Sequence, residues 1–132
     1  MKLDVWIEAL DPKLIEDLFE VERSEYKKII MEKQKKIISE GISLQYKSHF
    51  CCDSVDAPSW LIISIEIGKN VALPVALGIL SSYLYDKLKN RKNSRVVINN
   101  QPVEIDAKKI EQIILTNINV YVKEKEDNKD ET

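Results

Sequence analysis

The chain has 132 residues, of which 44% are hydrophobic and 32% charged, so it carries enough apolar material for one packed domain and too much for a disordered chain. Its 20 basic and 22 acidic residues give a net charge of −2, which excludes a chain that holds a nucleic-acid duplex by its overall charge. We therefore expect no nucleic-acid partner.

The first residues are not typical of a targeting signal. Asp4 and Glu8 interrupt the stretch that a signal peptide needs to be continuously apolar, so the sequence predicts a cytoplasmic protein. An uncharged apolar run spans residues 71–85, which is shorter than the about 20 residues that cross a bilayer. We expect a buried helix in this run and no membrane partner.

In chain order, the first expected element is a strand, because apolar and polar residues alternate over residues 3–10. The pair Asp11-Pro12 is typical of a helix start, an N-cap followed by a proline in the first turn. The apolar spacing and the order of charges, acids first and lysines later, predict a helix that runs to about Glu40 and ends at Gly41. A break near Ser24 would divide it into two shorter helices.

Two further strands are expected next. Residues 42–50 alternate, which places one set of side chains on a buried face: Ile42, Leu44, Tyr46, Ser48 and Phe50. Residues 60–67 form the other strand, and we expect it at the centre of the sheet because Trp60 and Ile62 make its second face partly apolar as well. These two strands should pair antiparallel. The strand at 42–50 should also lie parallel beside the strand at 3–10, through a right-handed crossover.

The second half predicts a helix and a hairpin. The helix begins at about Val71 or Pro74 and reaches Arg91, where its end is rich in basic residues. Residues 95–105 predict a β-hairpin that turns at Asn99-Asn100, since asparagine tolerates the positive φ angles of a two-residue turn.

Asp106 then caps a final helix. The sequence predicts an α+β fold with a mixed or antiparallel sheet of about five strands and three helices, in the order β-α-β-β-α-β-β-α. We expect one domain over residues 1–122 and a disordered, charged tail over residues 123–132, which have no apolar side chain.

Residues that usually carry catalysis or hold a metal are scarce. The three glycines are too few for a glycine-rich phosphate loop, and His49 is the one histidine, on a polar strand face where we expect it to meet solvent. The sharpest enzymatic suggestion is that Cys51 shares a strand face with His49, but a catalytic pair needs a third, orienting group. Together with Cys52 and Asp53 these residues resemble a metal cluster, yet they lack the second ligand pair of a zinc site. We therefore expect no enzyme, no metal and no cofactor.

The second half has a distinctive order of features. The helix ends in LSSYLYDKLKNRKNSR, and the hairpin VVINNQPVEIDAKKI leads directly into the last helix. Over residues 71–119 this order resembles the effector-associated constant component domains of bacterial conflict systems. That resemblance implies a non-enzymatic module that connects effector components through protein contacts.

We accordingly expect an adaptor for protein–protein interaction in a bacterial conflict or signalling system. The alternative is a small cytoplasmic inhibitor or immunity protein that binds a toxin or defence effector, and a third is a small-ligand binder that uses the basic end of the helix. A protein partner would contact an exposed sheet edge by strand addition, or the following side chains at the end of the helix: Tyr83, Tyr85, Lys87 and Arg91.

Overall fold

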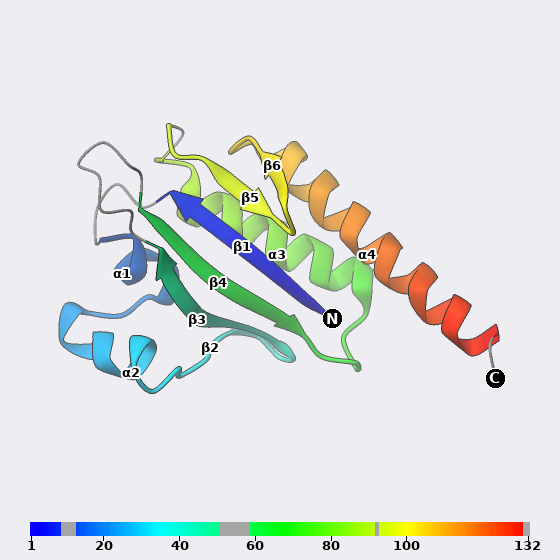
Figure 1. The fold of residues 1–132 in the computed structure, drawn as a ribbon, viewed down its shortest axis with the longest axis horizontal. Coiled ribbons are helices and arrows are strands. Elements are labelled where there is room, and N and C mark those ends of the chain that lie inside the picture. The colour runs from blue at the N-terminus through cyan, green and yellow to red at the C-terminus, as the bar shows by residue number, and fades with distance from the viewer. Residues whose placement is uncertain (9–12, 51–58, 92, 131–132) are drawn as a thin grey trace.

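The computed structural model describes residues 1–8, 13–50, 59–91 and 93–130, whose arrangement is shown in Figure 1. The strands are β1 (Lys2–Glu8), β2 (Lys36–Ser39), β3 (Ile42–Phe50), β4 (Trp60–Ile67), β5 (Val96–Ile98) and β6 (Gln101–Val103). The helices are α1 (Lys13–Phe19), α2 (Tyr26–Ile30), α3 (Leu73–Leu88) and α4 (Ala107–Asp130), and a 3₁₀ turn, η1 (Arg23–Glu25), precedes α2.

The strands form one antiparallel sheet in the order β2-β3-β4-β1-β5-β6. The expected α+β class is confirmed, with six strands and four helices among the described residues in place of about five and three. The antiparallel pairing of residues 42–50 with 60–67 and the interior position of β4 are also confirmed. The expected parallel neighbours are wrong, because β4 lies between β1 and β3. In this interior position both backbone edges of β4 are paired, one face of the strand lies in the core, and Trp60 and Ile62 lie on its other face.

The long helix expected from residue 11 to Glu40 is wrong in its second half. α1 ends at Phe19, and the next residue, Glu20, has a left-handed φ of 53°, which a helix does not continue through. The break expected near Ser24 is present as η1, and α2 adds only one further turn or so of helix. The proposed helix start at Asp11-Pro12 lies outside the described residues.

The rest of that expected helix forms the hairpin of β2 and β3. Lys33 has a φ of 55°, so the chain changes direction after α2 and then enters β2. Ile37 and Ile38 belong to this strand. Here backbone N–H and C=O groups form hydrogen bonds with β3, whereas in a helix they would bond to each other along the same segment. Gly41, with a φ of 80°, makes the turn into β3 and does not end a helix.

The second half of the chain follows the sequence more closely. The apolar run at 71–85 contains the buried helix α3, and no described helix is both long and apolar enough to cross a bilayer. The hairpin turns at Asn99-Asn100 with φ values of 47° and 68°, and the carboxylate of Asp106 accepts the backbone N–H of Lys109 at 3.1 Å, as an N-cap does. α4 continues to Asp130, where a disordered tail from residue 123 was expected. Lysine and glutamate are good helix formers, so the charged segment extends a helix that is already begun.

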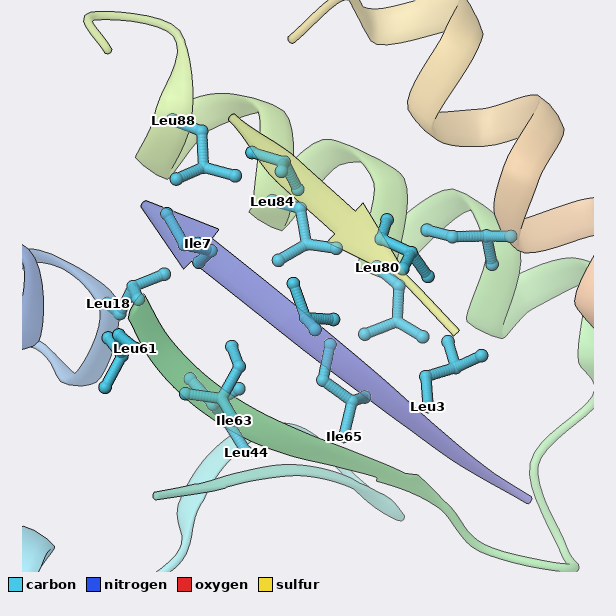
Figure 2. Close-up of a cluster of buried hydrophobic side chains, with 14 of the residues drawn as sticks. Leu3, Ile7, Leu18, Leu44, Leu61, Ile63, Ile65, Leu80, Leu84 and Leu88 are labelled. Carbon is cyan, nitrogen blue, oxygen red and sulfur yellow. The ribbon is translucent and has the colours of Figure 1, made fainter. Parts of the chain in front are cut away.

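The core lies between one face of the sheet and the helices. Alternate residues of β1 and β4 point into it, and α3 covers them with Leu80, Leu84 and Leu88 (Figure 2). α1, α2 and α4 contribute further buried side chains to the same cluster. The opposite face of the sheet is covered by no described helix, which leaves it as the broadest accessible surface of the sheet (Figure 1).

Candidate functional site

The side chains expected to contact a partner at the end of α3 lie in different environments. The Tyr83 hydroxyl donates a hydrogen bond to the backbone carbonyl of Leu18, and burial raises the pKa of Tyr83 well above its ordinary value. The guanidinium of Arg91 lies 3.1 Å from a carboxylate oxygen of Asp17, and only 12% of the Arg91 side chain is exposed. Both residues therefore hold α1 against α3.

Lys87 makes a third link of the same kind. Its ammonium lies 2.8 Å from Glu20 and 5.4 Å from the centre of the Tyr83 ring, while Glu20 also pairs with Lys36 at 3.1 Å. Hydrogen bonds from these two lysines hold the pKa of Glu20 below its ordinary value. Tyr85 instead lines a shallow groove between α3 and the start of α4. The four side chains thus do not form one free surface, and three of them are engaged within the fold.

His49 is exposed, as expected, and its ring lies beside Tyr46. The Tyr46 hydroxyl lies 2.9 Å from its Nδ1 atom, and partial burial of the ring lowers the pKa of His49 below 6.5. The suggested partner Cys51 and the other members of the metal-like cluster, Cys52 and Asp53, lie outside the described residues. Within the described part of the chain, no group of three or more histidine, cysteine or acidic side chains is placed to hold a metal ion.

A bulge in β3 changes which side chains share a face. The pairing with β4 shifts by one residue between Tyr46 and Ser48, so the alternation reverses after this point. Phe50 was expected on the buried face, but it lies opposite Trp60 on the uncovered face and is 53% exposed. The bulge therefore adds an aromatic side chain to the surface that the helices leave free.

The uncovered face carries a cluster that we call the tryptophan patch: Trp6, Phe50, Trp60, Ile62 and Val97. Trp6 on β1 is central, since it lies opposite Ile62 on one side and Val97 on the other. The rings of Trp6 and Trp60 meet edge to face, with centroids 6.4 Å apart and planes at 62°. Both tryptophans remain partly exposed, which makes them accessible to a partner.

Ion pairs surround this patch on the same face. Arg95 lies 2.6 Å from Glu8 and stacks over Trp60, with 5.1 Å between its guanidinium carbon and the ring centre. Further along the strands, Lys47 pairs with Asp4 at 3.1 Å. A third pair, of Lys35 with Glu66 at 3.2 Å, continues the pattern. The face therefore combines an aromatic cluster with nearly balanced charge.

Both edges of the sheet oppose the strand addition that was expected as one mode of contact. On β6, Pro102 lies opposite Val97 and has no N–H to offer a new strand. On the other side, β2 has only four residues, a register shift between Ile37 and Ser39, and a lysine, Lys36, as its first residue. Short, irregular, lysine-bearing edges are typical of natural protection against edge-to-edge pairing.

An open groove of about 800 Å³ adjoins the tryptophan patch. Trp60 and Arg95 line one part of it, and Val97, Pro102 and Ile105 line the apolar part. Ser94 also lines it, and the hydroxyl oxygen of Ser94 is buried and has no hydrogen-bond partner in the described part of the chain. The groove thus places one cation beside an apolar surface.

The tryptophan patch was not predicted from the sequence as a site. Trp6 and Trp60 each lie on the more polar face of an alternating strand. A large aromatic residue at such a position indicates that this face is more than a surface for solvent. Their contact depends on β1 lying next to β4, however, and the expected strand order did not place them together. No protein-family model, curated protein or solved structure matches the chain.

Proposed function

We propose that this chain is a non-enzymatic protein–protein interaction module, of the adaptor type found in bacterial conflict and signalling systems, and that the tryptophan patch is its contact surface. The observation that carries the proposal is the Trp6–Trp60 pair on a sheet face that no described helix covers, with Arg95 stacked beside it. Tryptophan and arginine dominate the residues that contribute most to protein interfaces. The resemblance of residues 71–119 to effector-associated domains supports the adaptor role.

The charge around the patch favours a protein partner over a nucleic acid. A surface that binds single-stranded nucleic acid stacks bases on aromatic rings but also needs unneutralised cations along the backbone path. Here Lys47 and Lys35 are each paired with a carboxylate, and Arg95 contacts Glu8 through Nε alone, so the face offers no continuous run of unneutralised cations. An apolar centre surrounded by mixed charges is instead the usual composition of a protein interface.

The test uses the full chain as bait in the host, followed by direct binding of the purified partner. Trp6→Ala removes the central ring of the patch, and Leu115→Ala is the matched control, because Leu115 is 41% exposed but lies on α4, outside the patch. We expect Trp6→Ala to weaken the partner's affinity by about 30-fold or more, the effect of losing a principal interface residue, and Leu115→Ala to change it little.

Melting curves of both variants show whether the fold is retained. A partner that binds the wild type and Trp6→Ala equally well would contradict the proposed surface. If the partner is a toxin or nuclease that loses activity in the complex, the inhibitor alternative replaces the adaptor role.

A further inference from the structure

Arg95 is held more firmly than an exposed arginine usually is. Its Nε–H donates to a carboxylate oxygen of Glu8 at 2.6 Å, and the guanidinium lies over the ring of Trp60. The backbones of the same two residues are joined as well, since the N–H of Glu8 donates to the carbonyl of Arg95 at 2.9 Å. The side chain of Glu8 is only 12% exposed, so the partner that orients Arg95 is itself fixed.

This arrangement uses one side of the guanidinium and leaves the other side available. The Arg95 side chain is 64% exposed, and its two terminal nitrogens have no hydrogen-bond partner among the described residues. Two parallel N–H groups on a planar guanidinium match the two oxygens of a carboxylate. Because the side chain is already oriented, binding such a group would require little further ordering.

The groove beside Arg95 indicates what carries the carboxylate. Val97, Pro102 and Ile105 offer apolar surface within the same 800 Å³ groove, so a small polar anion would leave most of it empty. Arg95 is the one cation among the described lining residues, and Glu104 also lines the groove. Glu8 already pairs with Arg95 and Glu104 lies in the groove, so the paired N–H groups of Arg95 suit the single charge of a carboxylate better than the nearly double charge of a phosphate.

We infer that this groove binds an extended segment of a partner protein in which an acidic side chain stands next to apolar ones, with its carboxylate held by the terminal nitrogens of Arg95. Recognition of extended peptides by grooves with aromatic side chains, and of acidic motifs by arginine, are both recurrent. The inference rests on the proposed function and specifies the sequence that the partner would present.

The experiment selects from a displayed library of short peptides, capped at both ends, on the immobilised full chain. The strongest peptide is then compared with its analogue in which the acid is replaced by the amide. We expect the selected peptides to share an acidic residue flanked by apolar residues, and the amide analogue to bind about tenfold or more weakly. Arg95→Gln should cause a similar loss for the acidic peptide and no further loss for the amide analogue.

Lys47→Gln is the control, because it removes a cation from the same face that is already paired with Asp4. Arg95→Lys keeps the charge without the paired N–H groups, so it should bind at an intermediate level even if Arg95→Gln were to disturb the fold. The inference is overturned if the selected peptides are not enriched in acidic residues. It is also overturned if the wild type and both Arg95 variants bind the acidic peptide with the same affinity. A partner whose binding depends on Trp6 but not on Arg95 would overturn it while leaving the proposed function intact.

Discussion

Replacing Gly41 by alanine tests the β2–β3 turn, which the sequence analysis assigned to the end of a helix. Gly41 has a φ of 80°, and a Cβ atom at this position would lie 2.4 Å from Cγ2 of Val71. A left-handed conformation costs an alanine about 1–2 kcal/mol, and forcing a methyl group into occupied space costs about 1–3 kcal/mol. The smaller freedom of alanine in the unfolded chain offsets about 0.4–1 kcal/mol. We expect Gly41→Ala to lower the free energy of unfolding by about 1–5 kcal/mol.

Urea denaturation followed by tryptophan fluorescence measures this loss. In a Val71→Ala background the steric part should vanish, so the two substitutions should couple by about 1–3 kcal/mol while the cost of the left-handed backbone remains. Gly78→Ala is the matched control, because a Cβ atom at this position of α3 would meet nothing within 4 Å. It should raise the free energy of unfolding by up to about 1 kcal/mol, since alanine favours a helix over glycine. An equal effect of Gly41→Ala in both backgrounds would refute the close approach to Val71, and no loss at all would refute the left-handed turn.

Three further predictions concern single side chains. Tyr83→Phe removes the hydrogen bond to the Leu18 carbonyl and should cost about 1–3 kcal/mol in thermal unfolding, since a buried acceptor is left unpaired; an unchanged melting temperature would contradict it. Ser94→Ala removes a buried hydroxyl for which the described residues supply no partner, so it should be neutral or stabilise by about 1 kcal/mol, and a clear loss in the same assay would count against this account. Folding lowers the pKa of His49 below 6.5, so protonation favours the unfolded chain and stability should fall as the pH drops below that value. His49→Gln should remove this part of the pH dependence, as measured by urea denaturation from pH 7 to about pH 5.

The parts of the fold that the sequence predicted well are those with a local cause. Asn99-Asn100 turns a hairpin because both residues adopt positive φ angles, and Asp106 caps a helix through a hydrogen bond to a residue three positions away. The apolar second face of β4 likewise indicated an interior strand without reference to its neighbours.

The features that the sequence did not reveal depend on partners elsewhere in the chain. The adjacent pair Ile37 and Ile38 fits one face of a helix or an edge strand, and pairing with β3 decides between them. The bulge after Tyr46 is a property of the register with β4, so simple alternation placed Phe50 on the wrong face. For the candidate site, the alternation of the sequence was enough to place Trp6 and Trp60 on the outward face. Their contact and the stacking of Arg95 could be predicted only with knowledge of the strand order.

The position of β1 in the sheet has a consequence for how the chain acquires its structure. Among the described residues β1 pairs with β4 and β5, and both of these strands lie far along the sequence from it. A ribosome adds about 5–20 residues each second, so during synthesis this apolar strand waits seconds for its first neighbour. Pairings between such distant segments also make folding slow, because a long loop must close before any contact forms. β1 therefore stays open to contacts with other chains until β4 and β5 have been made and can pair with it.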